Sequence, residues 1–289
     1  MEQGGVGVIY ERARAKINLS LDVRHKRNDG YHELESIMQT VDLSDYITLF
    51  PRDEAGVSLT INTPFLPVDE RNLAYKAAQV MRQVCGIKEG VHIDIDKRIP
   101  VAAGLAGGSS NAAAVLRGLN RLWQLDLPLS EISAIGARVG SDVPFCVYGG
   151  TALVRGRGEW VEPLPLQPAY WVLLAKPPVA VSTAEIYADL KLDEVTNHPR
   201  AHAMIAALQS GSLQQVAEAA GNVLETVTLQ RFPEIDRIKD QFARLGMTVS
   251  LMSGSGPTVF GLTDKEQKAK KAFNSLRPAI KELFLCQTC

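Results

Sequence analysis

The sequence has no long apolar run and almost no net charge. Its 31 lysine and arginine residues nearly balance its 32 aspartate and glutamate residues, so the formal net charge is −1. Such a balance gives no general electrostatic attraction to nucleic acid or to an anionic membrane. No apolar stretch approaches the roughly 20 residues that a membrane-spanning helix needs, and the N-terminal segment shows no basic region followed by an apolar one. We therefore expect a cytoplasmic protein that binds neither nucleic acid nor membrane.

Cysteine is also scarce, with four residues in a chain of 289. Few, scattered thiols in an intracellular chain favour reduced cysteines over a disulfide framework. Cys286 and Cys289 form a C-x-x-C pair, but no second His or Cys pair lies near enough in the sequence to complete a structural zinc site. We interpret this pair as part of the chain's tail.

Strand-like and helix-like segments alternate along the chain, which predicts an α+β fold. Residues 6–23 favour two extended pieces, and the Asp29-Gly30 pair indicates a turn. Helices are expected over 69–86, 111–123 and 130–140, with a hairpin over 145–161. Later helices are expected over 183–190, 200–209, 213–225 and 234–245. A proline-containing stretch at 162–179 suggests two domains, an N-terminal one over 1–160 and a C-terminal one over 161–289.

One stretch, "VAAGLAGGSSNAAAVLRGLNRLW", changes character halfway: small residues precede a segment with helical periodicity. Glycine and alanine let a ligand approach the backbone closely, and a helix N-terminus offers unpaired N–H groups to an anion. Ser109 and Ser110 add hydroxyls that could cap the helix, contact a phosphate or help to hold magnesium. The loop is neither a Walker A motif nor G-x-G-x-x-G. A tight packing turn remains an alternative to a phosphate loop.

A second glycine loop, "MSGSGPTVFG", lies between two strand-like runs. Taken alone it is typical of a hairpin, but beside the first loop it becomes a candidate second wall of the same site. Two polar residues in apolar settings, Lys16 and Asp142, could serve phosphoryl transfer there. The carboxylate would orient or accept a hydroxyl proton, and the ammonium would stabilise negative charge. A solvated strand end for Lys16 and a turn position for Asp142 remain alternatives.

The segment "PVAAGLAGGSSNAAAVL" resembles the glycine-serine motif of the GHMP kinases, a superfamily of small-molecule kinases. The segments "ARAKINLSLDVRHKRNDGYHELES", "GSDVPFCVYGGTALVRGRGE" and "SGSGPTVFG" resemble one member whose acceptor carries a cytidine diphosphate group. The resemblance extends from about residue 8 to about residue 285. It implies a ribosomal-S5-like N-terminal domain followed by a ferredoxin-like C-terminal domain. The preceding "MEQGGVG" lies outside the match and is expected to be disordered.

The resemblance assigns roles to individual residues. Lys16 and Asp142 match the catalytic lysine and aspartate, with Asp142 as base toward the acceptor hydroxyl. Asn18, Tyr31 and His32 match the lining of the cytidine site, where Tyr31 would stack on the base and His32 would read its edge. Tyr187 takes the place of a second stacking aromatic. The ATP phosphate loop corresponds to Pro100, Val101, Ala102, Ala103, Gly104, Leu105, Ala106, Gly107, Gly108, Ser109 and Ser110.

The family also implies ATP as co-substrate, with Mg²⁺ and Ser110 as a candidate metal ligand. Small molecules are the expected partners, and the chain is expected to be a monomer or homodimer. Ala102, Ala103 and Ala106 replace glycines of some members, which preserves close approach if their φ angles stay negative.

Two alternatives remain. A kinase of the same superfamily for homoserine, mevalonate or a sugar would share the first loop but would not require Tyr31 and His32. A non-catalytic binding protein of this fold would more often have lost Lys16 or Asp142.

Overall fold

The computed structural model describes residues 7–289, so the expectation of disorder over residues 1–7 falls outside the described part except at Gly7. The chain forms two compact units, each built from separate segments. Unit 1 contains the described part of Met1–Ala15 together with Ser44–Ile99 and Ala106–Gly149. Unit 2 contains Lys16–Leu43, Pro100–Leu105 and Gly150–Cys289. The sequence predicts one domain boundary, at 160/161, whereas each of these two units combines separate segments of the chain. The boundary at 160/161 stays a prediction.

Two long neighbouring strands, β1 (Ile9–Lys26) and β2 (His32–Arg52), contribute residues to both units. The two extended pieces expected over 6–23 are therefore one continuous strand of 18 residues. The predicted turn after β1 is present. The Arg27 N–H donates to the Tyr31 carbonyl at 2.8 Å, and Gly30 has a φ of +85°, which glycine adopts without a steric penalty.

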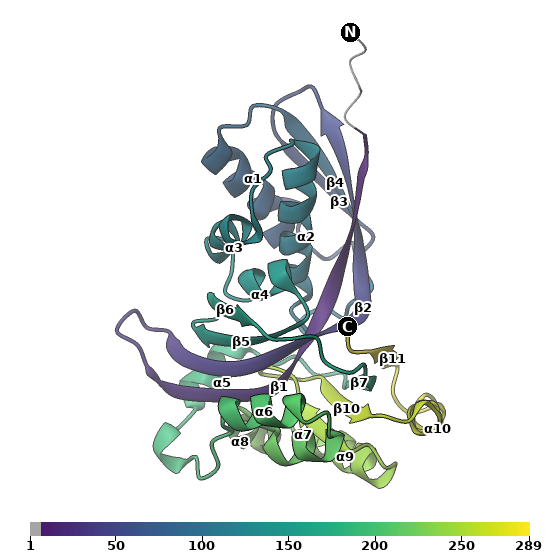
Figure 1. Cartoon of the computed structure of the whole chain (residues 1–289). Coiled ribbons are helices and arrows are strands. Elements are labelled where there is room, and N and C mark those ends of the chain that lie inside the picture. Colours follow the sequence, from purple (N-terminus) through teal and green to yellow (C-terminus); the bar gives the residue numbers. More distant parts are fainter. Residues whose placement is uncertain (1–6) are drawn as a thin grey trace. The chain divides into compact units, whose positions relative to one another are not determined.

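In unit 1, strand β4 (Gly90–Asp96) lies between β2 and β3 (Val57–Ile61). β4 pairs antiparallel with residues 46–52 of β2 and parallel with β3. Four helices accompany these strands, and Figure 1 shows them grouped together: α1 (Leu73–Cys85), α2 (Gly107–Leu122), α3 (Leu129–Ala137) and α4 (Val143–Tyr148). Apolar side chains from strands and helices share one buried core.

Local sequence signals explain where α1 begins and ends. The Asn72 side chain caps its N-terminus by accepting the Ala74 N–H at 3.0 Å. Gly86 ends it in the left-handed conformation, with a φ of +67°. Ala77 and Met81, four residues apart, are buried on its inner face. The expected helix over 69–86 is thus confirmed apart from its first turn.

Unit 2 contains two groups of paired strands. In the first, β2 pairs antiparallel with β5 (Thr151–Gly156), which pairs with β6 (Trp160–Pro163). β1 pairs parallel with the two-residue strand β8 (Gly221–Asn222) through Ser20 and Leu21. The expected hairpin is therefore present as β5–β6. The residues before it, expected to be extended, form α4 instead.

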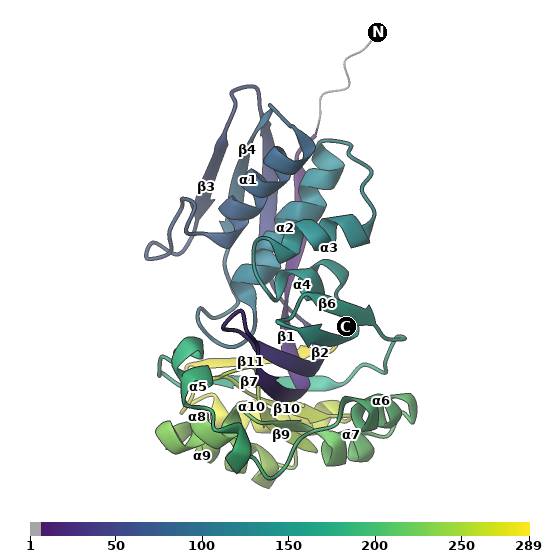
Figure 2. The ribbon, with the colours of Figure 1, turned by 90° about the vertical axis from the view of Figure 1, so that its left-hand side faces the viewer.

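The second group is an antiparallel sheet with the order β11-β7-β10-β9. Numbered along the chain, this order is 4-1-3-2, the arrangement of a ferredoxin-like fold. Figure 2 shows α9 and α10 beside this sheet, and both pack on its strands. The elements are β7 (Trp171–Lys176), β9 (Val249–Met252), β10 (Val259–Thr263), β11 (Glu282–Gln287), α9 (Pro233–Arg244) and α10 (Glu266–Leu276).

The remaining elements of unit 2 are α5 (Thr183–Asp189), the 3₁₀ helix Leu192–Glu194, α6 (Ala201–Gln209), α7 (Leu213–Ala219) and α8 (Glu225–Arg231). The expectation of a single helix over 213–225 was wrong. α7 ends at Ala219, and β8 separates it from α8. Gly221 and Asn222 both have low helix propensity, and their strand pairing with β1 provides the backbone partners that a helix would have supplied.

Over residues 7–289, no helix is both long enough and apolar enough to span a membrane. Cys286 is buried on β11, and burial raises the pKa of its thiol well above the usual range. A thiol held protonated in this way is a poor nucleophile and a poor metal ligand, which agrees with a structural role for this residue.

Candidate functional site

The ammonium group of Lys16 is held between two groups of unit 2. Lys16 lies on β1 and is only 4% exposed. Its Nζ donates to the Asn18 Oδ1 at 2.8 Å and to the Gly104 carbonyl at 3.1 Å, while its backbone N–H donates to the Leu105 carbonyl at 3.1 Å. A solvated strand end is therefore excluded for Lys16, and the residue is tied directly to the first glycine loop.

Asn18, fully buried on the same face of β1, connects this lysine to the second glycine loop. Its Oδ1 also accepts the Gly254 N–H at 3.0 Å. Its Nδ2 donates to the Ser36 Oγ at 2.9 Å, and that hydroxyl donates to the Ser20 carbonyl at 2.6 Å. The amide orientation is thus fixed by partners on both sides, and it presents its oxygen to Lys16 and to the loop.

The two glycine loops meet at Gly104. The Ser253 Oγ donates to the Gly104 carbonyl at 2.9 Å. A Cβ atom on Gly104 would lie 2.2 Å from the Ser253 carbonyl oxygen and 2.9 Å from that of Gly256, and the φ of Gly104 is +73°. No other residue type fits this position without movement of the backbone. The interpretation of the second loop as a neighbour of the first, and not an isolated hairpin, is supported.

The first loop carries backbone strain at two alanines. Ala102 and Ala106 have φ angles of +50° and +55°, so the condition of a negative φ angle is not met at these two alanines. A left-handed conformation costs a non-glycine residue about 1–2 kcal/mol. Residues in such conformations persist where surrounding contacts hold them, and they concentrate at functional sites.

The second half of the matched segment belongs to unit 1, where it opens α2. The N-cap of α2 is Ala106, with no side-chain cap. Ser109 and Ser110 therefore lie inside the first turn, and neither caps the helix. The Ser110 Oγ donates to the Arg14 carbonyl at 2.6 Å, and Ser110 is 2% exposed. The backbone N–H groups of Gly107 and Gly108 remain at the helix start, where an anion is stabilised.

Asp142 lies in unit 1 as the N-cap residue of α4. Its side chain does not cap that helix, although its carbonyl accepts the Cys146 N–H at 3.1 Å. Because Lys16 belongs to unit 2, the pairing of these two residues stays a prediction.

The aromatic residues expected to bind a base lie in unit 2. Tyr187, on α5, has its ring centroid 5.2 Å from that of His32, with 31° between the planes. This spacing is within the range of favourable aromatic pairs. Burial, and secondly the charge of Lys26, lower the pKa of His32 below its usual value. His32 is therefore a neutral imidazole at neutral pH, with one nitrogen that donates and one that accepts.

Tyr31 immediately precedes His32 in the sequence, and 53% of its surface is accessible to solvent. The Arg157 guanidinium lies 4.9 Å from the centroid of the Tyr31 ring, a cation–π contact. The Tyr31 N–H donates to the Asp29 Oδ1 at 3.1 Å. The Asp-Gly turn thus fixes the backbone from which Tyr31 and His32 project.

Sequence reasoning missed two groups that hold the second loop. The Asn222 Nδ2 donates to the carbonyls of Met252 at 2.9 Å and Gly254 at 2.7 Å. The Thr183 hydroxyl, at the start of α5, lies 2.7 Å from that of Ser255. For Asn222, the available sequence signal was the Gly221-Asn222 pair, because it interrupts an otherwise helical pattern. No sequence signal pairs Thr183 with Ser255.

Comparisons with known proteins show the family to which the chain belongs. The family model "GHMP kinases N terminal domain" matches residues 72–150, and "GHMP kinases C terminal" matches residues 204–281. A curated protein of Bacillus licheniformis named 4-diphosphocytidyl-2-C-methyl-D-erythritol kinase is 55% identical over 276 residues, covering 96% of this chain and 95% of the relative. A protein of the same name from Bacillus subtilis is 54% identical with the same coverage.

Solved structures extend the comparison. A crystal structure of 4-(cytidine 5'-diphospho)-2C-methyl-D-erythritol kinase has a TM-score of 0.82 at 33% identity, covering 97% of this chain and 99% of the other. A homoserine kinase from Cytophaga hutchinsonii has a TM-score of 0.80 at 22% identity, covering 100% and 96%, which shows a common fold. The chain therefore belongs to the GHMP kinases and, within them, to the family of 4-diphosphocytidyl-2-C-methyl-D-erythritol kinases.

Proposed function

We propose that this protein transfers the γ-phosphoryl group of ATP to the 2-hydroxyl of 4-diphosphocytidyl-2-C-methyl-D-erythritol, releasing the 2-phosphate and ADP. This is a step of the non-mevalonate route to isoprenoids, which we place in the cytoplasm. The observation that carries the proposal is the buried Lys16 ammonium at the junction of both glycine loops. Such a fixed cation next to the backbone of two glycine loops is suited to stabilising phosphoryl charge.

The first loop and the start of α2 would hold the phosphates of ATP. Gly104, Gly107 and Gly108 lack side chains, so backbone N–H groups can approach the phosphate oxygens. α2 is 16 residues long, and its N-terminus carries a partial positive charge that favours anions.

Asp142 would accept the proton of the 2-hydroxyl as that oxygen attacks the γ-phosphorus. The new O–P bond forms while the bond from the γ-phosphorus to the bridging oxygen breaks, and ADP leaves with the electron pair. Lys16 would stabilise the negative charge on the transferred group during this exchange. Because Asn18 and Gly104 fix the Lys16 ammonium beforehand, little reorganisation is needed during the reaction.

Magnesium would enter with ATP and neutralise charge on its phosphates. Ser110 is the matched candidate ligand, but its proton is already donated to the Arg14 carbonyl and its side chain is buried. These contacts favour a role for Ser110 in holding α2 against β1. We therefore assign the metal chiefly to the phosphate oxygens.

The cytidine base would stack against Tyr187 and Tyr31, and the neutral His32 would read its edge by one donated and one accepted hydrogen bond. Stacking tolerates any base, whereas edge contacts discriminate among bases. The Thr183–Ser255 contact connects the helix that carries Tyr187 to the second loop. Binding of the base and order in that loop would thus support one another.

The test is ADP release by the purified protein with Mg²⁺ and ATP, offering the cytidine substrate, mevalonate and homoserine separately. Turnover confined to the cytidine substrate is the expected result. Turnover of another acceptor would retain the kinase chemistry and remove Tyr31 and His32 from base recognition. An absence of turnover with all three would favour a non-catalytic binding protein.

A further inference from the structure

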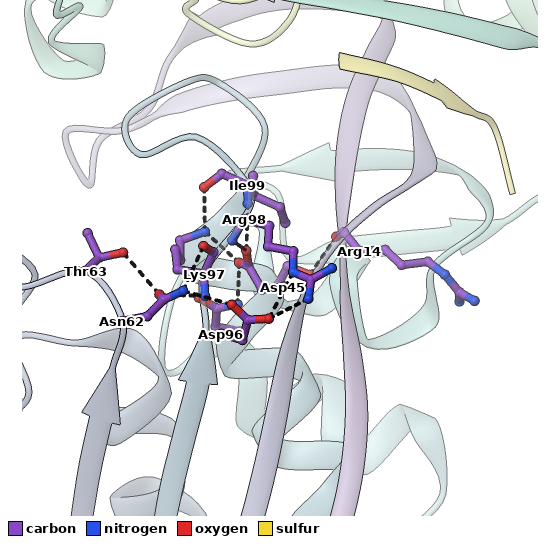
Figure 3. Close-up of polar contacts among 10 residues, drawn as sticks. Arg14, Asp45, Asn62, Thr63, Asp96, Lys97, Arg98 and Ile99 are labelled. Atoms are coloured by element: carbon purple, nitrogen blue, oxygen red, sulfur yellow. Dashed lines mark hydrogen bonds and ion pairs between the residues drawn. The ribbon is translucent and has the colours of Figure 1, made fainter. Parts of the chain in front are cut away.

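A buried carboxylate in unit 1, Asp45 on β2, accepts four hydrogen bonds, and Figure 3 shows it beside Lys97, Arg98 and Ile99. Its Oδ1 accepts the backbone N–H groups of Arg98 at 2.6 Å and Ile99 at 2.7 Å. Its Oδ2 accepts the Lys97 ammonium at 2.6 Å and the Asn111 Nδ2 at 2.7 Å. Asp45 is fully buried. A carboxylate with this many donors is held in one orientation.

The four donors lie at both ends of the first loop. Ile99 immediately precedes Pro100, where the loop begins, and Asn111 lies just after the first turn of α2, where the loop ends. Asp45 therefore fixes the chain that enters the loop and the helix that leaves it through a single side chain. The spacing of the loop's two ends depends on this carboxylate.

Lys97 provides the counter-charge and touches the helix start. It is 7% exposed, and its Nζ also donates to the Ile99 carbonyl at 2.9 Å. A Cβ atom on Gly107 would lie 2.8 Å from that Nζ. Burial lowers the pKa of Lys97, and the Asp45 carboxylate opposes that effect. The ammonium thus neutralises a buried negative charge at the end of α2 where phosphate would bind.

Outer residues hold the same segment in place. The Asn62 Oδ1 accepts the Lys97 N–H at 2.9 Å, and its Nδ2 donates to the Asp96 Oδ1 at 2.8 Å (Figure 3). The Arg98 side chain turns away to Asp96, with the Nε 2.9 Å from the Oδ2. Only the backbone of Arg98 faces Asp45, so the arrangement orients the main chain that enters the loop.

We propose that Asp45 is a positioning residue for ATP, which sets the geometry of the phosphate loop by tying its two ends, with Lys97 as its required counter-ion. This inference rests on the proposed function, because that function assigns the first loop to ATP. Asp45 touches no substrate in this account and acts through the backbone that it holds.

The experiment measures ATP binding by calorimetry without acceptor, alongside steady-state KM values for ATP and for the cytidine substrate. Asp45→Asn should weaken ATP binding by about tenfold or more, because displacement of a positioning group by about 1 Å costs on the order of 100-fold. The KM for the cytidine substrate should stay within about twofold of the wild-type value, since its binding residues are elsewhere. Asn111→Ala removes only the helix tie and should weaken ATP binding by about threefold to tenfold with a smaller loss of stability.

Leu59→Ala is the matched control, because Leu59 is an apolar residue buried in the core of unit 1 on β3 and is not a hydrogen-bond partner of Asp45. It should lower Tm while leaving ATP binding at the wild-type value. A parallel loss of affinity in Leu59→Ala, or unchanged ATP binding in Asn111→Ala and Asp45→Asn, would overturn the inference. If Asp45→Asn does not fold, the comparison of Asn111→Ala with Leu59→Ala decides it. Wild-type protein that binds ATP but shows no turnover would refute the proposed function and leave this inference standing, whereas absence of ATP binding would overturn both.

Discussion

The Asn18 amide oxygen lies 2.8 Å from the Lys16 Nζ and at the same time accepts the N–H of Gly254 at 3.0 Å. One atom of β1 therefore couples the orientation of the ammonium to the position of the second glycine loop. Both contacts use the single side-chain oxygen of Asn18, so the loss of that oxygen would remove both of them.

Replacement of Asn18 by alanine should therefore damage both stability and catalysis. The change removes one of the acceptors of the buried Lys16 ammonium, which keeps the Gly104 carbonyl, and it leaves the Gly254 N–H without the Asn18 oxygen, at a cost of about 1–3 kcal/mol. We expect a lower Tm and a loss in kcat of about 100-fold, since charge stabilisation is misplaced. Thermal unfolding and steady-state kinetics measure the two effects. Ser36→Ala is the control, because it removes the acceptor of the amide NH₂ group and the donor to the Ser20 carbonyl while the amide oxygen keeps both of its donors; equal kcat in both variants would contradict the role of Asn18.

Asp142→Ala should abolish turnover while ATP binding stays near the wild-type value. The missing group is the proton acceptor of the 2-hydroxyl, and general-base catalysis typically contributes about 100- to 10,000-fold. Single-turnover phosphoryl transfer and ATP calorimetry check the two parts. Asp142→Asn keeps the shape of the side chain without its basicity. Turnover close to wild type in either variant would refute Asp142 as the base.

The affinity for the cytidine substrate should depend on the protonation of His32. Because burial lowers the pKa of His32 below 6.5, the folded protein keeps a neutral imidazole as the pH falls through 6.5. We expect a constant KM for that substrate above this pH and a rising KM once the pH falls below the lowered pKa. Over the same range the unfolded chain takes up a proton first, so the free energy of unfolding also decreases.

KM profiles of wild type and His32→Gln between about pH 5.5 and 8 test this dependence. His32→Gln keeps a donor and an acceptor that do not titrate, so its profile should be flat over the low-pH arm. An identical rise in KM for both proteins would assign the titration to another group. In His32→Ala the KM for the cytidine substrate should rise at every pH, with the KM for ATP unchanged.

Asn222→Ala tests a residue whose role in holding the second loop was not predicted from the sequence. The substitution deprives two carbonyls, those of Met252 and Gly254, of their shared donor. We expect a loss of about 1–3 kcal/mol in the free energy of unfolding, together with a lower kcat through the displaced second loop. Urea unfolding and kinetics provide the measurement. Gln215→Ala, at an exposed position of α7, is the comparison variant and should change neither quantity.

Removal of magnesium should stop turnover without unfolding the protein. Over residues 7–289, no three His, Cys, Asp or Glu side chains gather in a way that could hold a metal ion. EDTA should therefore abolish ADP release and leave the Tm of the ATP-free protein unchanged, and added Mg²⁺ should restore activity. A large drop in Tm with EDTA would indicate a structural metal instead.

The sequence predicted much of the site because its main parts follow local rules. A single sequence directly displays both a loop of small residues before a helix and a glycine-rich segment between two strands. The meeting of the loops at Gly104 depends on contacts over 149 residues of sequence, as between Ser253 and Gly104. The presence of two glycine loops in one sequence suggested a shared site, whereas periodicity could not show that the loops meet.

Other features depended on tertiary contacts that override local preference. The positive φ angles of Ala102 and Ala106 oppose the intrinsic tendency of alanine, so no propensity argument could have found them. The end of α7 at Ala219 reflects the pairing of β8 with β1, about 200 residues earlier in the chain. Asp45 appears in the sequence as one acidic residue among 32, and only its four donors distinguish it.

The missing side chain of Gly104 has a consequence for inhibitors of this enzyme. Every substitution at that position adds a Cβ, and a Cβ would overlap the Ser253 carbonyl at 2.2 Å. A compound that binds the backbone of Gly104 would therefore contact a position at which any resistance substitution would disrupt the fold around Lys16. Escape from such a compound would have to arise at neighbouring residues.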